Sequence, residues 1–193
     1  MRRINIKRMI LIALFAALMV VGAYIRIPNP FFPVYFTFQG VFCAFAGLLM
    51  GSKSGAASVI LYIAMGLLGL PVFSSPPAGP QYVLQPTFGF LLGFAAAAYI
   101  MGRISESAVE YTVGKALLAS FCGLTTIFII GINYMYLINI IYINSQISYW
   151  VLVCGMSMYF LKDLILFILV GVTSVQIRRQ VFAYTYHAFD TKK

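Results

Sequence analysis

Lys162 and Asp163 place an ammonium and a carboxylate side by side at the start of a strongly apolar run, 164–170. Ionisable groups are expensive inside a bilayer and are usually retained for a task, so this pair predicts a ligand site. Neighbouring residues of a regular helix point about 100° apart. We therefore do not expect the two charges to face each other as a simple ion pair.

The aromatic residues one turn earlier extend this candidate site. Tyr159 and Phe160 precede Asp163 by one helical turn and so share its face. An acceptor between aromatic rings suits a flat polar heterocycle that carries N–H donors. Alternatives stay open for both charges. Lys162 either meets an anionic end of the ligand or snorkels to the membrane surface, and Asp163 either binds ligand or serves as an internal helix cap or ion-pair partner.

The elements that position this site are expected to be transmembrane helices. Of the 193 residues, 62% are apolar and 9% charged, whereas soluble domains average roughly 25% charged residues. Apolar stretches of about 17–20 residues, long enough to cross a bilayer core, recur along the chain. We predict an all-α integral membrane protein, a single transmembrane domain (1–193) forming a compact bundle of six transmembrane helices. The spans are expected at about 9–25, 34–50, 56–70, 87–102, 116–139 and 158–176, with outer loops at 26–33, 71–86 and 140–157.

The basic residues predict how these helices are oriented. The net charge is +9, and of the 13 Lys and Arg all except Arg26 and Lys162 fall at segment ends or tails that the six-span arrangement places inside. Cytoplasmic loops carry such an excess, so both termini are predicted to be cytoplasmic. An α-helix rises about 1.5 Å per residue, so Asp163 is expected about 22 Å outward of Arg178, in the outer half of the bilayer. A substrate would therefore arrive from outside.

Composition also argues against several function classes. No basic face is interleaved with aromatics, so no nucleic-acid partner is expected. Cys43, Cys122 and Cys154 are widely spaced and form no CxxC pattern, and the single histidine, His187, lies in the polar tail. We therefore expect no metal site, no cofactor and no enzyme. The sequence has no GxxxxGK[ST] loop, so energy for moving a solute would come from a partner or a gradient.

Two segments outside the site carry further signals. The proline-rich stretch 71–86 includes Phe73 and Tyr82, and such aromatics favour a folded lid over a disordered linker. Ala13 and Ala17 share one face of the first helix and would let another helix approach closely. Packing within this protein and docking of a partner protein both stay open for that face.

Several short motifs follow one another in order along the chain. They are RIP at 26–28, PVYFTFQ at 33–39, AGLLMG at 46–51, LY at 61–62 with GLPVF at 69–73, QPTFG at 85–89, and FLKDL at 160–164. Together they resemble the BioY family of biotin-uptake proteins, the substrate-binding S components of energy-coupling-factor (ECF) transporters. At the last motif the chain departs from the family pattern, because Leu161 and Lys162 stand where Pro-Gly often precedes the aspartate, and Leu166 stands where a lysine often follows it.

The resemblance implies a six-helix membrane protein that binds biotin with high affinity from the outside. It further implies coupling to a transmembrane T component and two cytoplasmic ATPases, with Ala13 and Ala17 as the docking contact. Asp163 would accept from the ureido N–H groups of biotin, and the biotin carboxylate would meet Lys162 or Arg26. Further polar lining is expected from Tyr82, Gln85 and Gln39.

Three alternatives to biotin uptake are kept. The chain could be an S component for another vitamin, such as thiamine or riboflavin. It could be an intramembrane enzyme, although a second acid, a histidine or an activated serine is missing near Asp163. It could also be a membrane protein with no transport role.

Overall fold

The computed structural model describes residues 6–28, 35–76, 78–107 and 110–190, with side chains up to residue 180. This part of the chain is mostly helical and contains six α-helices. They are α1 (Ile6–Tyr24), α2 (Gln39–Met50), α3 (Ser52–Leu67), α4 (Phe88–Glu106), α5 (Val113–Ile141) and α6 (Tyr149–Asp190). By length and composition α1, α4, α5 and α6 (over Tyr149–Gln180) can each cross a membrane, whereas α2 and α3 are shorter apolar helices.

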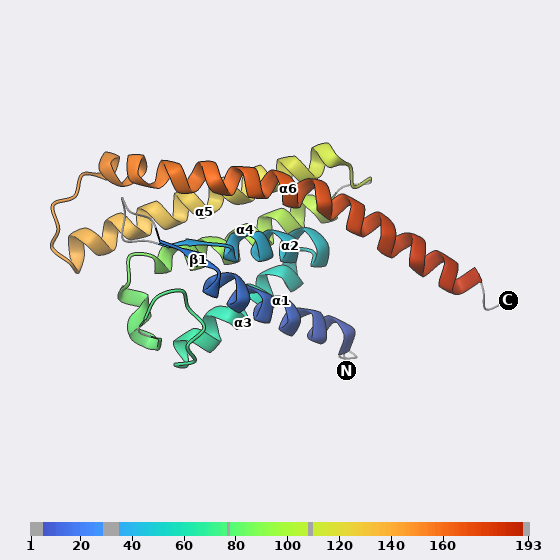
Figure 1. The fold of residues 1–193 in the computed structure, drawn as a ribbon, viewed down its shortest axis with the longest axis horizontal. Helices are drawn as coiled ribbons and strands as arrows, with labels where there is room; N and C mark the ends of the chain where they lie inside the picture. The colour runs from blue at the N-terminus through green and yellow to red at the C-terminus, as the bar shows by residue number, and fades with distance from the viewer. Residues whose placement is uncertain (1–5, 29–34, 77, 108–109, 191–193) are drawn as a thin grey trace.

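The helices pack side by side with α2 and α4 in the middle (Figure 1). α4 packs against α2, α3 and α5, and α2 also packs against α1, α3 and α6. α5 and α6 lie against each other along one side, and the last part of α6 runs on beyond the other helices. The beginning of α1 and the end of α6 lie at the same end of the molecule.

A one-residue corner joins α2 to α3 and holds α4 close. Gly51, between the two helices, has φ +82°, a conformation that glycine adopts without strain. A Cβ on Gly102 of α4 would lie 2.2 Å from the Ser52 nitrogen, so only glycine permits this approach. Glu106 accepts hydrogen bonds from the Ser52 N–H at 2.9 Å and the Ser52 hydroxyl at 2.7 Å. The end of α4 therefore caps the start of α3.

Residues 71–76 and 78–86, here called the lid segment, are folded, which confirms that part of the prediction. They include a short 3₁₀ helix, η1 (Pro80–Leu84). Phe73 and Tyr82 are buried, and their ring centroids lie 4.1 Å apart. The Tyr62 hydroxyl donates to the Val72 carbonyl at 3.0 Å. The packed aromatic rings and this bond from α3 attach the segment to the helices.

Several helix boundaries differ from the expected segments. α2 begins at Gln39 because the residues before it form strand β2 (Phe36–Thr37), which pairs antiparallel with β1 (Arg26–Ile27). α3 begins at Ser52, earlier than expected, because Glu106 caps it from a distant part of the sequence.

α6 begins at Tyr149, so the helix includes 149–157, a stretch expected to be outer loop. Leu152, Met156 and Tyr159 are all buried, and their spacing of four and three residues marks one helical face. Polar neighbours such as Ser145 and Ser148 obscure this periodicity in the sequence. In α5, Asn133 and Asn139 donate to the carbonyls of Ile129 and Met135 in their own helix, so these amides do not interrupt it.

Candidate ligand site

A cavity of about 90 Å³ lies between β2, α2, α4, α5, α6 and the lid segment. Its lining combines polar side chains with apolar and aromatic ones, which is typical of small-molecule sites. The polar lining consists of Tyr35, Thr37, Gln39, Ser74, Ser75, Tyr82, Thr87, Lys162 and Asp163. The remaining lining is Phe90, Leu91, Phe94, Ile127, Phe128, Met156 and Tyr159.

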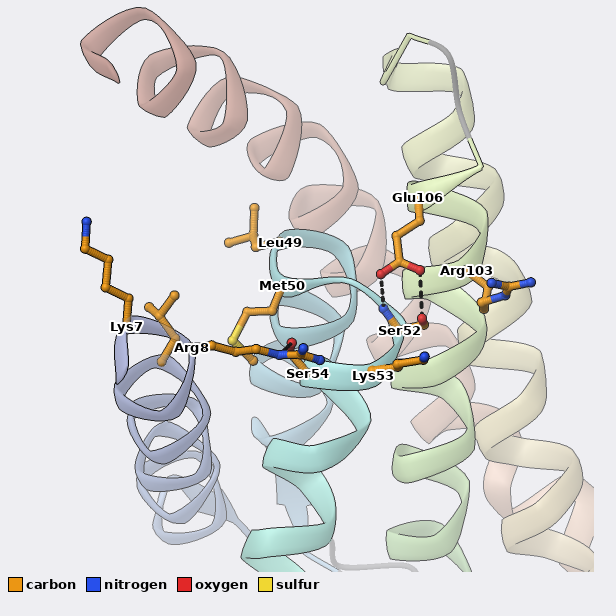
Figure 2. A pocket seen from close by; sticks show the side chains of 10 residues that line it. Lys7, Arg8, Leu49, Met50, Ser52, Lys53, Ser54, Arg103 and Glu106 are labelled. Carbon is orange, nitrogen blue, oxygen red and sulfur yellow. Dashed lines mark hydrogen bonds between the residues drawn. The ribbon is translucent and has the colours of Figure 1, made fainter. Parts of the chain in front are cut away.

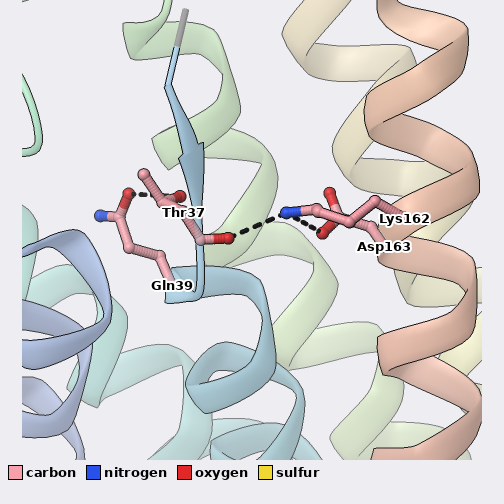
Figure 3. Close-up of polar contacts among 4 residues, drawn as sticks. All are labelled: Thr37, Gln39, Lys162 and Asp163. Atoms are coloured by element: carbon pink, nitrogen blue, oxygen red, sulfur yellow. Dashed lines mark hydrogen bonds and ion pairs between the residues drawn. The ribbon is translucent and has the colours of Figure 1, made fainter. Parts of the chain in front are cut away.

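Lys162 and Asp163 form an ion pair in this cavity (Figure 3). The Lys162 Nζ lies 2.7 Å from the Asp163 Oδ1 and donates to the Thr37 carbonyl at 2.9 Å. The prediction that the two charges would not face each other was wrong. The Cα–Cβ bonds do diverge along a regular helix, but the four-carbon stem of lysine is long enough to bring the ammonium back to its neighbour. The ammonium therefore points into the site, where it joins α6 to β2.

Aromatic rings surround the ammonium. The Lys162 Nζ lies 5.6 Å from the ring centroid of Phe36 and 6.0 Å from that of Phe38. The Phe36 ring in turn packs against Tyr159, with centroids 4.4 Å apart. Such rings attract a cation at these distances. They hold Lys162 in a partly desolvated place where its charge acts strongly on a ligand.

Gln39 is the polar group on the α2 side of the cavity, and a chain of hydrogen bonds orients it. Its amide Nε2 donates to the Tyr62 hydroxyl at 2.6 Å, and its Oε1 accepts from the Thr37 hydroxyl at 3.2 Å. The Tyr62 hydroxyl in turn donates to the Val72 carbonyl of the lid segment. Since Gln39 and Tyr62 are both buried, this network fixes the amide and connects β2, α3 and the lid segment.

Tyr82 supplies a neutral hydroxyl from the lid segment. Only 2% of the residue is exposed. Burial raises the pKa of Tyr82, an effect that hydrogen bonds with the hydroxyls of Thr87, Ser74 and Ser75 partly oppose. A cluster of hydroxyl groups thus lines the cavity together with the charged pair. These groups can donate to or accept from a polar ligand without carrying charge.

The cavity brings together five of the eight predicted ligand residues, and the roles of all eight stay predictions. Gln39, Tyr82, Tyr159, Lys162 and Asp163 line it, and Phe160, Gln85 and Arg26 do not.

The three residues outside the lining have other contacts. Phe160 packs edge-on against Phe128, with ring centroids 5.1 Å apart. The Gln85 backbone closes turns with Tyr82 and Phe88. Arg26 donates to the Ser74 carbonyl at 2.7 Å and lies over the Tyr35 ring at 5.3 Å. Arg26 therefore contacts two residues of the lining without reaching the cavity itself.

Thr37, Ser74, Ser75 and Thr87 line the cavity but were not predicted from the sequence. Thr37 reaches the cavity from β2, Ser74 and Ser75 from the lid segment, and Thr87 from the start of α4. Small hydroxyl residues are common in loops and turns, so the sequence alone does not separate Ser74, Ser75 and Thr87 from ordinary turn residues.

The predicted docking residues lie on the outer face of α1. Ala13 and Ala17 are exposed, whereas Ala16 between them is 1% exposed and packs in the core. α1 packs inward through Ala16, Met19 and Ala23. The face that carries Ala13 and Ala17 is therefore not used for packing inside this protein.

Comparison with known proteins identifies the family. The model of the BioY family matches residues 1–183. The chain belongs to the BioY family. The BioY resemblance noted from its motifs is thereby confirmed.

Relatives and a solved structure agree with this assignment. This BioY-family chain is 42% identical over 141 residues to a probable biotin transporter BioY of Lysinibacillus sphaericus, covering 73% of this chain and 70% of the relative. It is 33% identical over 187 residues to a putative biotin transporter BioYB of Bacillus subtilis, covering 95% and 94%. Its fold is similar to the crystal structure of the S component for biotin from an ECF-type ABC transporter, with a TM-score of 0.78, 20% identity, and coverage of 93% and 94%. At that identity the structural likeness concerns the fold.

Proposed function

We propose that this BioY-family protein binds biotin from the outside and serves in its uptake across the bacterial cytoplasmic membrane as the S component of an ECF transporter. Family membership and relatives named as biotin transporters support this. The observation that carries the proposal is the Lys162–Asp163 pair in a cavity with aromatic walls.

Biotin presents groups that complement this pair. Its ureido ring offers two N–H donors for the Asp163 carboxylate, and its carboxylate is an anion for the Lys162 ammonium. Binding would thus separate the ion pair and give each charge a new partner, which avoids leaving either one desolvated and alone. Tyr159 and the apolar side of the cavity would cover the sulfur-containing ring and the aliphatic chain.

The cavity has to widen for this ligand. Its volume is about 90 Å³, and pockets for compact organic ligands measure about 300 Å³ or more. Ser74, Ser75 and Tyr82 of the lid segment form one wall, and loops move more readily than packed helices. We propose that the lid segment moves outward to admit biotin and closes over it afterwards.

Coupling to partner proteins is the second part of the proposal. Ala13 and Ala17 leave a small-residue face of α1 uncovered, and such a face suits close helix packing in a membrane. A transmembrane T component would dock there, and two cytoplasmic ATPases would supply the energy. We further propose the six-span arrangement with both termini cytoplasmic, which the position of α1's start and α6's end at one end of the molecule supports.

Equilibrium titration of the purified protein with biotin tests the proposed ligand. We expect tight binding of one biotin per chain, and no competition from thiamine or riboflavin at tenfold molar excess. Absence of binding at micromolar biotin would overturn the proposal. Displacement by thiamine or riboflavin would instead favour an S component for that vitamin.

A further inference from the structure

A second and larger cavity, which shares no lining residue with the ligand site, lies where α1 begins and α4 ends. Figure 2 shows it from close by. It measures about 700 Å³ and is formed by α1, the α2–α3 corner and α4. Four cationic side chains line it, from three different elements: Lys7, Arg8, Lys53 and Arg103. We call it the basic groove. Biotin binding as proposed above makes no use of it.

The charges of the basic groove favour an anionic ligand. Its four cations face a single carboxylate, that of Glu106. Glu106 is already engaged by the N–H and hydroxyl of Ser52 at the start of α3. The amino end of a helix carries a partial positive charge that offsets a carboxylate bound there. The groove therefore keeps an excess of positive charge.

One cation is held in place before any ligand arrives. The Arg8 Nε donates to the Ser54 hydroxyl at 2.6 Å, and Ser54 itself is buried at the α2–α3 corner. This bond turns the guanidinium of Arg8 from α1 toward α3, as Figure 2 shows. A guanidinium is the side chain best suited to phosphate oxygens, because its N–H groups form a planar fork.

Apolar side chains lie among the cations of the groove. Leu11, Leu49 and Met50 line it, and Leu11 lies one turn along α1 from Arg8, where the apolar stretch of that helix begins. In the membrane orientation proposed above, the cations stand at the boundary between water and hydrocarbon, next to exposed apolar side chains of α1. Leu11 and Leu14 are 44% and 49% exposed on α1. An acyl chain can run along this surface while its headgroup stays in the groove.

From this juxtaposition we propose that the basic groove binds the phosphate headgroup of an anionic phospholipid of the inner leaflet. The phosphate lies among Arg8, Lys53 and Arg103, and the acyl chains follow α1 past Leu11. A lipid would use both the cations of the basic groove and the apolar side chains among them. Free phosphate would use the cations alone.

Native mass spectrometry of the full-length protein tests this. The protein in detergent is titrated with phosphatidylglycerol and, separately, with phosphatidylcholine carrying the same acyl chains. We expect one phosphatidylglycerol to be retained at concentrations where phosphatidylcholine is not. Inorganic phosphate at 10-fold excess should not displace it. Equal retention of both lipids overturns the proposal, and displacement by inorganic phosphate overturns the lipid as the source of the phosphate.

Variants show whether the groove is the site. Lys53→Gln and Arg103→Gln should each weaken phosphatidylglycerol binding about fivefold, the effect of one basic residue near an anionic lipid. Lys115→Gln removes a charge at the start of α5, outside the groove, and serves as the matched control. An equal loss in that control would mean diffuse attraction and would contradict a defined site.

Glu106→Gln should tighten phosphatidylglycerol binding, whereas a misfolded variant would bind it more weakly. Glutamine keeps an acceptor for Ser52 but removes the one negative charge of the groove, so phosphatidylglycerol binding should tighten severalfold. Unchanged or weaker binding in this variant, with a melting temperature near that of the wild type, would overturn the proposal.

Discussion

At the scale of single residues, the partner of Asp163 is its own neighbour. The Lys162 ammonium lies 2.7 Å from the carboxylate and 2.9 Å from the Thr37 carbonyl. A ligand that enters must replace these contacts. One with N–H donors and an anionic end satisfies both charges, whereas one with donors alone leaves the ammonium without its carboxylate. In the proposed site the pair would therefore select against ligands that carry only one of the two groups.

Asp163→Asn should weaken biotin binding about 10- to 100-fold. The variant places an NH₂ group where one carboxylate oxygen stood, so a charge-assisted hydrogen bond worth about 1.5–3 kcal/mol is lost. Isothermal titration with biotin measures it. Glu110→Gln, which neutralises an exposed carboxylate outside the cavity, is the control and should bind as the wild type does. Wild-type affinity in Asp163→Asn would contradict the assignment.

Lys162→Gln tests where the carboxylate of biotin binds. The wild type should prefer biotin over its methyl ester by at least about tenfold, because the ester has no charge for the ammonium. In Lys162→Gln this preference should disappear while the ester binds with nearly unchanged affinity. If the preference persists there but is lost in Arg26→Gln, the carboxylate binds Arg26 instead.

At the scale of elements, the lid segment is fastened at several points. Arg26 holds the Ser74 carbonyl, the Tyr24 hydroxyl donates to the Pro71 carbonyl, and the Tyr134 hydroxyl donates to the Val83 carbonyl at 2.5 Å. These contacts come from α1, β1 and α5 and reach the segment from two sides. The proposed movement of the lid segment would require some of them to break, so we expect their strength to set how fast a ligand enters and leaves.

Arg26→Gln should increase both the association and the dissociation rate of biotin severalfold, with a smaller change in Kd. The variant removes a bond that holds the lid segment closed, which affects the passage of the ligand in both directions. Stopped-flow fluorescence measures the two rates. Gln81→Ala, which removes a bond to Ala78 within the lid segment, is the control and should change them less. A slower association rate alone would indicate direct attraction of biotin by Arg26.

Ala13→Trp combined with Ala17→Trp should abolish uptake of labelled biotin by whole cells and leave binding by the purified protein intact. Both positions are exposed, so large side chains fit in the isolated protein but block close approach of another helix. Ala16→Trp, at the buried position between them, should lower the melting temperature and binding as well. Leu118→Trp, on the exposed face of α5, should leave both activities unchanged.

At the scale of the whole molecule, the two cavities lie at opposite ends of the helices. The ligand site is near the lid segment, and the basic groove is where α1 begins and α4 ends. In the proposed orientation the first faces outward and the second meets the inner leaflet. Biotin binding and lipid binding then occur on different sides of the membrane, and each can be tested without disturbing the other.

Cysteine labelling tests this orientation. In a background in which Cys43, Cys122 and Cys154 are replaced by alanine, a membrane-impermeant maleimide should label Ser148→Cys in intact spheroplasts but not Ser107→Cys. Both positions are exposed, so access depends on the side of the membrane. After lysis both should react. The reverse pattern in intact spheroplasts would mean the opposite orientation.

Hydrophobic patterning explains why the helical character was predictable. Apolar runs broken by Pro, Gly and charged residues are local features, and each helix in the described part of the chain overlaps an expected segment. The first and last residues of the helices were harder to predict. α3 starts at Ser52 because of Glu106, and α2 starts late because β2 pairs with β1. Such contacts join residues far apart in the chain and leave no trace in local spacing.

The sequence by itself determined the mostly helical fold, the family, and the choice of Asp163 as a candidate ligand residue. Apolar periodicity, ordered motifs and a rare charge are all local features of the amino-acid sequence. Tertiary structure decided what surrounds that acid. Lys162 returns to it, Thr37, 125 positions earlier, holds the ammonium, and hydroxyls of the lid segment cover the cavity. Arg26 and Phe160 lie outside it. Side-chain reach and the packing of distant segments govern these outcomes, and neither can be read from the spacing of neighbours.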